Sequence, residues 1–125
     1  MATKARVVKI RRIYDPPAGP EGYLALVDRL WPRGIKASRD LFDEWAKDAA
    51  PSSDLRRWYG HDPAKFAEFA RRYRDELGRA PARSTVQHLA DISARAPLTL
   101  LTATKDVEHS GALVLAQVIK ATPPS

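Results

Sequence analysis

Two short apolar segments, far apart in the chain, constrain the fold more than any other feature of this sequence. They are "YLALV" within residues 23–30 and "LTLLT" within residues 98–103. Each has the composition of a buried strand, and its apolar residues are nearly continuous, as in strands covered on both faces. The sequence between them has helical patterns. Because strands joined through helices run parallel, we expect these two to belong to a parallel sheet.

A further strand is expected near the N-terminus. The segment "RVVKIRRIY" at residues 6–14 mixes β-branched residues with charge, and the Pro/Gly-rich stretch "DPPAGPEG" at 15–22 must form a loop. This loop is short enough for a hairpin, but it also suits a tight crossover to a parallel strand. Its length alone leaves both pairings open.

The middle of the chain favours helices whose ends carry capping residues. Asp40 is expected to cap a helix over 41–50, in which apolar residues recur at intervals of four. Ser52 is expected to cap a short helix, and Gly60 lies just past its end, as glycine commonly does.

The second half of the chain predicts three more helices around the apolar strand. Asp62 followed by Pro63 is a strong helix start, and the apolar stripe that follows runs to about Leu77. A weaker helical pattern covers residues 84–96. Asp106 is expected to cap the last helix, which is apolar enough to pack closely on a sheet.

The alternation of strands and helices predicts an α/β fold. We expect a small, mainly parallel sheet flanked by helices on both faces, in a three-layered, Rossmann-like arrangement. With 125 residues, of which 44% are hydrophobic and 29% charged, the chain has the length and composition of a globular domain. No linker or repeat divides it, so residues 1–125 are expected to form a single domain.

Several classes of protein are excluded or disfavoured. The sequence has no cysteine, which rules out disulfides, thiolate catalysis and cysteine-ligated zinc. No apolar run approaches the ~20 residues that a membrane span needs, and the N-terminal segment lacks the apolar stretch of a signal peptide. A cytoplasmic protein with no membrane partner is therefore expected. No glycine-rich phosphate loop or helical metal-binding spacing occurs, so no cofactor and no metal are expected.

The positive charge is unevenly distributed. The net charge is +6, and residues 1–39 alone account for an excess of this size. Such a bias attracts nucleic acid or phosphorylated metabolites. The alternative is that Lys4, Arg6 and Lys9 only protect the edge of a sheet. The arginines of residues 56–57 and 71–74 would form a second basic patch if they met.

The candidate site follows from the rule that open parallel sheets bind ligands beyond the carboxyl ends of their strands. The segments "DRLWPRG" at 28–34 and "TATKD" at 102–106 each follow an expected strand. If the strands are parallel, both segments lie at the same end of the sheet, beside a helix N-terminus that favours anions. The turn "WYGHD" at 58–62 is a third polar cluster, and its Tyr59 and His61 are expected to reach the cleft.

Each candidate residue is assigned a role by its chemistry. Asp28 and His109 are the candidate catalytic residues, because each can move a proton, and His109 is expected in the first turn of the last helix, where an imidazole stays neutral. The candidate ligand-binding residues are Arg29, Arg33, Lys105, Tyr59 and His61. For Asp28 an ordinary ion pair is an equally good explanation, and Trp31 fits either the core or an exposed anchor.

Five segments resemble a known family: "YDPP", "LVDRLWPRG", "DEWAKDAAPSSDLRRWYGHDP", "FARRYRDEL" and "ATKDVEHSGALVLAQVI". Together they are similar to the short, YeaO-like branch of domain of unknown function 488. The resemblance implies a compact α/β protein and brings no settled activity. Longer relatives resemble the chain at Asp28, Pro32 and Arg33, but have cysteines where Thr102 and Ser110 stand here. They also have a helix between the first two strands, which implies parallel pairing in this chain.

Three hypotheses follow for function. In the first, the polar cleft binds a phosphorylated or carboxylated small molecule, with turnover of that molecule left open. In the second, the basic N-terminal third binds nucleic acid. In the third, the chain is a protein-interaction module anchored by Trp31. A charged cleft serves enzymes and binding proteins alike, so the sequence does not separate the two, nor does it specify an oligomeric state.

Overall fold

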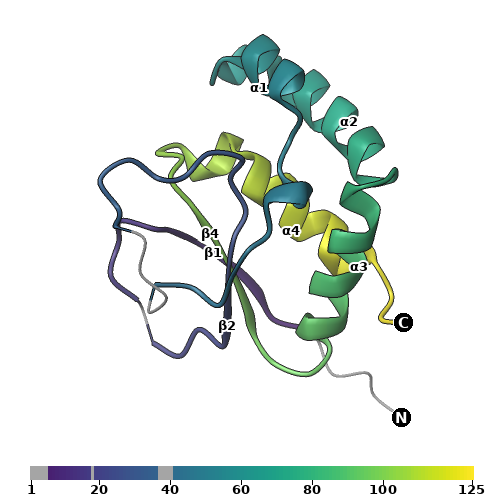
Figure 1. Cartoon of the computed structure of the whole chain (residues 1–125). Coiled ribbons are helices and arrows are strands. Elements are labelled where there is room, and N and C mark those ends of the chain that lie inside the picture. Colours follow the sequence, from purple (N-terminus) through teal and green to yellow (C-terminus); the bar gives the residue numbers. More distant parts are fainter. Residues whose placement is uncertain (1–5, 18, 37–40) are drawn as a thin grey trace.

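A parallel sheet lies at the centre of the structure (Figure 1). The structure is a computed structural model that describes residues 6–17, 19–36 and 41–125. Within these residues four strands form one sheet in the order β1-β4-β2-β3, and every pairing is parallel. The strands are β1 (Val8–Arg12), β2 (Tyr23–Leu26), β3 (Glu44–Trp45) and β4 (Leu98–Thr102). The α/β class and the parallel sheet predicted from the sequence are confirmed.

Strand β4 is the centre of the sheet. It pairs with β1 on one side and with β2 on the other, and all five of its residues are buried. Leu98 and Leu100 point into the larger apolar cluster, whereas Leu101 belongs to a smaller cluster on the opposite face. Burial on both faces explains why its apolar residues are continuous rather than alternating.

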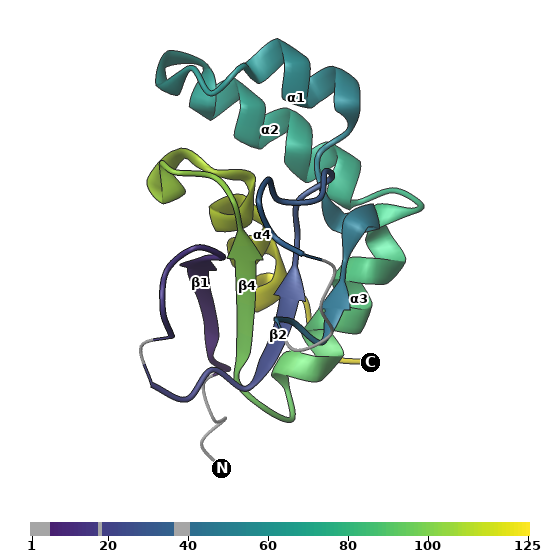
Figure 2. The ribbon, with the colours of Figure 1, turned by 60° about the vertical axis from the view of Figure 1, so that its left-hand side comes forward.

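Of the four α-helices in the described residues, two cover one face of the sheet and two lie beyond the ends of its strands. They are α1 (Ser53–Tyr59), α2 (Phe66–Leu77), α3 (Ala82–Ser93) and α4 (Gly111–Ala121). Figure 2 shows α3 and α4 behind the strands, and α1 and α2 beyond the ends toward which the strand arrows point. The apolar side chains of α2, α3 and α4 join those of the strands in the larger cluster. The carboxyl ends of the strands therefore face a layer of helix rather than open solvent.

The opposite face of the sheet is covered by loops. The cluster on this face combines Ile13, Leu26 and Leu101 with side chains that include Phe42 and Trp45. All the described members of this cluster come from strands and loops. Loop residues thus occupy the position at which the sequence predicted a second layer of helix.

The helix predicted over residues 41–50 is wrong. Asp40, its expected cap, lies outside the described residues, and the rest of the segment forms strand β3 and a 3₁₀ turn, η1 (Lys47–Ala49). Strand β3 adds to the edge of β2 through hydrogen bonds from Asp43 N to Leu24 O and from Ala46 N to Leu26 O. Pairing with an open sheet edge outweighs the helical spacing of apolar residues, because local propensity is weak against tertiary contacts.

The helix ends test the expected caps. Ser52 and Asp62 each accept a hydrogen bond from a backbone N–H in the first turn, and Gly60 ends α1 in the left-handed conformation, as predicted. Asp106 is not the cap of α4. A 3₁₀ turn, η3 (Val107–His109), follows it, and the cap is Ser110, which accepts from Leu113 N.

The connection from β1 to β2 crosses over to a parallel strand, and the hairpin alternative is wrong. Strands β1 and β2 both pair with β4, which lies between them. The chain enters β2 by passing closely over residue 97, where Tyr23 N donates to Pro97 O. Gly22 is required there: its φ is +70°, and an added Cβ would lie 2.1 Å from Pro97 O.

A pair of glycine substitutions tests this close approach. Gly19 lies in the same loop with φ +97°, but an added Cβ there meets no atom within 4 Å. Gly19→Ala should cost about 1–2 kcal/mol of unfolding free energy, from the left-handed backbone alone. Gly22→Ala should cost at least about 2 kcal/mol more, because backbone atoms must move. If urea denaturation shows equal losses of unfolding free energy in the two variants, the close approach at Gly22 is contradicted.

Candidate functional site

A pocket lies at the carboxyl ends of β2 and β4, with a volume of about 450 Å³. The loop after β2, the loop after β4, the start of α4 and the end of α1 form its walls, and Tyr14 lies at its border. All seven residues predicted for the site border this one pocket: Asp28, Arg29, Arg33, Tyr59, His61, Lys105 and His109. The rule that parallel sheets bind ligands beyond the carboxyl ends of their strands thus predicted where the pocket lies. The role of each residue remains a prediction.

Asp28 ties the two central strands together at the pocket floor. Its Oδ1 accepts a hydrogen bond from Thr102 Oγ1 at 2.7 Å, and its Oδ2 accepts one from Ala103 N at 2.7 Å. Burial raises the pKa of the Asp28 carboxyl, while the two hydrogen bonds and the nearby His61 act in the opposite direction. No ion pair holds Asp28 among the described residues. Its carboxylate instead accepts from neutral groups.

Arg29 has a structural role that its predicted role did not include. Its Nε donates to Pro51 O at 2.8 Å, and its Nη2 lies 3.4 Å from Ala50 O. These bonds hold the segment before α1 against the end of β2. Two of the five guanidinium N–H donors of Arg29 are directed at backbone carbonyls, so the fold holds this side chain in place and only part of its donor capacity is left for a ligand.

Tyr59 and His109 connect α1 to the turn before α4. The Tyr59 hydroxyl donates to His109 O at 2.5 Å, and its ring stacks on Phe69 with centroids 4.2 Å apart. Burial, and then the nearby Asp106 and Asp62, raise the pKa of the Tyr59 hydroxyl. Tyr59 is therefore a neutral hydroxyl with a bound proton, and it shapes the pocket wall.

His109 lies in η3 rather than in the first turn of α4 as predicted. The reason is that the helix begins only at Gly111, after the 3₁₀ turn. Its Nδ1 lies 2.8 Å from Asp106 Oδ2, and its ring packs edge-on against Phe66. This arrangement fixes the ring and leaves Nε2 without a partner among the described residues. Asp106, predicted as a cap, positions this histidine instead.

His61 has a backbone conformation that is uncommon for a residue with a side chain. Its φ is +56°, immediately after Gly60, also at +56°. Residues other than glycine are seldom found there, and histidine is among those enriched. Two successive left-handed residues turn the chain sharply between α1 and α2. The exposed imidazole of His61 thereby borders the pocket.

Three cationic side chains at the pocket have no hydrogen-bond partner in the part of the chain that the structure describes. Arg33 and Lys105 were predicted, whereas Arg56 was assigned only to the second basic patch. Arg56 belongs to α1, next to the "WYGHD" turn, and that proximity is the signal by which the sequence could have placed it. The first residues of α4, Gly111 and Ala112, also border the pocket, and the first N–H groups of a helix have no partner within it.

Trp31 is not an exposed anchor. It is half-buried, and its ring packs against Phe42 and Trp45 with centroids 5.5 and 5.4 Å apart. Its indole N–H donates to Ile35 O. Trp31 therefore contributes to the loop layer over the sheet, and the core interpretation is the one that these contacts support.

The basic residues of the N-terminal third are largely engaged within the protein. Arg6 donates to Ile119 O and Lys120 O at the end of α4. Arg11 forms a bidentate pair with Glu21, and Lys9 lies 3.4 Å from Pro20 O. Lys4 lies outside the described residues. These contacts leave few free cations on β1 for a nucleic-acid surface.

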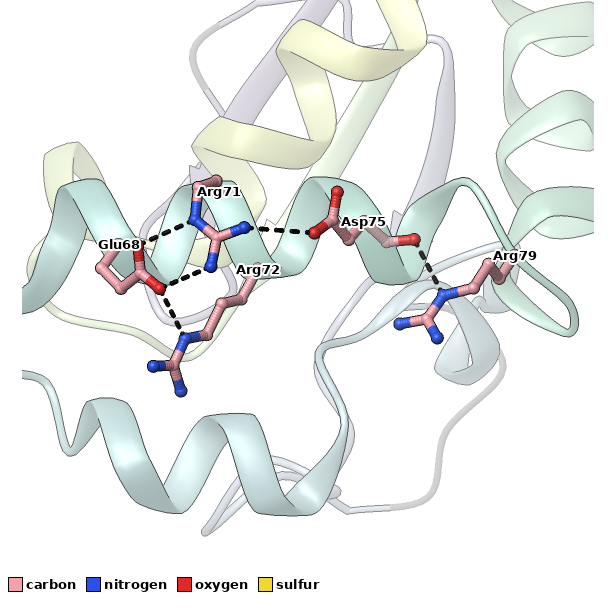
Figure 3. A network of polar contacts seen from close by, with 5 residues as sticks. All are labelled: Glu68, Arg71, Arg72, Asp75 and Arg79. Atoms are coloured by element: carbon pink, nitrogen blue, oxygen red, sulfur yellow. Dashed lines mark hydrogen bonds and ion pairs between the residues drawn. The ribbon is translucent and has the colours of Figure 1, made fainter.

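The part of the second basic patch that lies on α2 is also engaged in ion pairs. Figure 3 shows Glu68 of α2 between Arg71 and Arg72, with distances of 2.7 and 2.8 Å between Glu68 Oε2 and their guanidinium nitrogens. Arg71 also reaches Asp75 at 3.4 Å. Hydrogen bonds from the two arginines lower the pKa of Glu68 to about 2. The arginine-rich face of α2 is thus a network of exposed ion pairs rather than an uncompensated positive surface.

Neither a metal site nor a membrane span is found in the described part of the chain. No three His, Asp or Glu side chains come together there in a way that could hold a metal ion. No described helix is long and apolar enough to cross a membrane.

Comparison with known proteins assigns the chain to a family. A family model described as the inactive DUF488-N3 subclade matches residues 7–123. The chain belongs to the DUF488 family. It is 41% identical over 113 residues to the uncharacterised protein YeaO of Escherichia coli K12, covering 90% of this chain and 96% of that protein.

Other DUF488 relatives are equally similar. An uncharacterised protein of Mycobacterium tuberculosis H37Rv is 41% identical over 112 residues, covering 90% of this chain and 92% of that protein. No solved structure matches. The resemblance to the YeaO-like branch of DUF488 is therefore confirmed, and the family remains one of unknown function.

The Asp28 linkage can be tested by its effect on stability. Asp28→Ala should lower the free energy of unfolding by about 1–3 kcal/mol, because Ala103 N and Thr102 Oγ1 lose their acceptor. Asp106→Ala is the matched control and should stay within about 0.5 kcal/mol, because its partner His109 is at the surface. Urea denaturation measures the free energy of unfolding of both variants. An unchanged value in Asp28→Ala would contradict the linkage.

The Glu68 network predicts a specific titration. The pKa of the Glu68 carboxyl should be about 2. In the double variant Arg71→Ala and Arg72→Ala, this pKa should return toward about 4.3. Because the native pKa is lowered, this group stabilises the fold above its unfolded pKa, and that contribution is lost as the pH falls toward 2. NMR titration measures the midpoint, and an ordinary value in the unmodified protein would show that the pairs are absent in solution.

Proposed function

We propose that this protein binds a small phosphorylated or carboxylated molecule in the pocket at the ends of β2 and β4. One observation carries the proposal: Arg33, Arg56 and Lys105 border the same pocket as the N-terminus of α4. These side chains come from three different segments. Their convergence on a helix N-terminus provides both mobile positive charge and fixed N–H donors for an anion.

The state of the other polar groups supports binding rather than turnover. Both oxygens of Asp28 already accept hydrogen bonds, and the Tyr59 hydroxyl donates its proton to a carbonyl. These groups are satisfied by the protein and are poorly placed to move a proton on a ligand. The description of the matching subclade as inactive agrees with this reading. We therefore propose a binding protein, in which Asp28 is a structural residue.

Isothermal titration calorimetry at low salt tests the proposal. The probes are inorganic phosphate, glucose 6-phosphate and citrate, with a short single-stranded DNA as a comparison. Lys105→Ala and Arg56→Ala should each weaken binding of the responsive anion by roughly tenfold or more, because each removes a charge-assisted hydrogen bond. Arg57→Ala is the matched control: it is the neighbour of Arg56 on α1 but pairs with Asp54 outside the pocket, so it should change affinity less than about twofold.

The outcomes separate the functions. Binding of no small anion, or equal affinity in all three variants, would refute the pocket as an anion site. Binding of DNA alone, unaffected by Lys105→Ala, would move the function to another surface. If the bound phosphate ester is also hydrolysed in wild-type protein, as followed by ³¹P NMR, the assignment as a binding protein without turnover is wrong.

A further inference from the structure

The border of the pocket includes exposed apolar side chains as well as cations. Among the described residues, four large apolar side chains are exposed: Val7, Tyr14, Leu30 and Leu41. Two of them, Leu30 at 58% and Tyr14 at 44% exposure, border the pocket. A single exposed leucine needs no explanation. Two such side chains at one pocket, beside free cations, favour a ligand with both apolar and anionic parts.

The aromatic part of this border is held in place. The Tyr14 hydroxyl donates to Arg33 O at 2.7 Å, and the Arg12 guanidinium lies 5.5 Å from the centroid of the Tyr14 ring. These contacts join the loop after β1 to the loop after β2. Because the ring is already ordered, contact with a ligand costs less conformational entropy than it would for a mobile side chain.

The inner wall of the pocket continues this apolar surface. Val27, Pro32, Phe69 and Ala103 line the same cavity as the cationic side chains. Pockets of several hundred cubic ångströms, lined mainly by apolar groups with a few polar ones, typically bind organic molecules of moderate size. Inorganic phosphate would fill only a small part of the 450 Å³ available and would leave the apolar wall uncovered.

We propose that the ligand is an aromatic organic anion, whose phosphate or carboxylate lies near Lys105 and Arg56 and whose ring contacts Leu30 and Tyr14. This inference rests on the proposed function, and it adds the chemical class of the ligand. Burial of a ring against an ordered apolar border adds affinity that a bare anion does not gain.

Calorimetric titration with inorganic phosphate and phenyl phosphate tests the class of ligand. Phenyl phosphate should bind at least roughly tenfold more tightly than inorganic phosphate. Leu30→Ser should weaken the binding of phenyl phosphate by about fivefold and leave that of inorganic phosphate unchanged, because the side chain contacts only the ring. Val7→Ser is the matched control: Val7 is also exposed, but it lies at the opposite end of the sheet, where Val7 O accepts from Leu98 N.

The variants distinguish this inference from the function on which it rests. Lys105→Ala should weaken both probes. If both bind equally and only Lys105→Ala matters, the anion site stands and the aromatic class is overturned. If Leu30→Ser leaves phenyl phosphate affinity unchanged, the ring does not contact this border and the class is again overturned. If neither probe binds, the proposed function fails together with the inference.

Discussion

The carboxylate of Asp28 holds together the part of the structure on which the rest of the site depends. It accepts from Thr102 Oγ1 and Ala103 N, so it fixes the distance between the ends of β2 and β4. The backbone carbonyl of Asp28 accepts a hydrogen bond from Trp45 Nε1, which connects the edge strand β3 to the same position. Burial of this carboxylate costs free energy, as its raised pKa indicates, and the hydrogen bonds from Thr102 and Ala103 offset part of that cost. This connection between β2 and β4 forms the pocket floor.

Thr102 and Ser110, where the family resemblance implies cysteines in longer relatives, have structural roles in this chain. Thr102 donates to Asp28, and Ser110 accepts from the first turn of α4. A thiol, which is a weak donor and acceptor, would make these hydrogen bonds poorly. In this chain the site is therefore built around oxygen-based contacts that stabilise the fold. Such contacts suit a pocket whose walls are fixed.

Much of the fold and of the pocket could be predicted because local signals agreed with the tertiary structure. The buried strand at β4, the caps Ser52 and Asp62, and the meeting of polar residues at the carboxyl ends of the strands all follow from short-range rules.

Residues 41–50 could not be predicted, because apolar residues spaced by four also suit a strand added to an open edge, and only the presence of β2 decides between the two. Asp106 and Ser110 are both good caps, and the 3₁₀ turn between them selects Ser110. Arg56 was assigned to a second basic patch, because the sequence does not show that this part of α1 borders the pocket.

The polar residues around the pocket fall into two groups with different physical roles. Those that make short hydrogen bonds within the protein, such as Asp28, Arg29 and Tyr59, are fixed and define its shape. Those without described partners, Arg33, Arg56 and Lys105, are long, flexible and cationic. Fixed walls reduce the entropy lost on binding, while flexible cations adjust to the position of an anion. This division supports recognition of a ligand more directly than it supports proton transfer, which needs a catalytic group that is both free and precisely held. His109 comes nearest to that requirement, with its ring positioned by Asp106 and its Nε2 without a described partner.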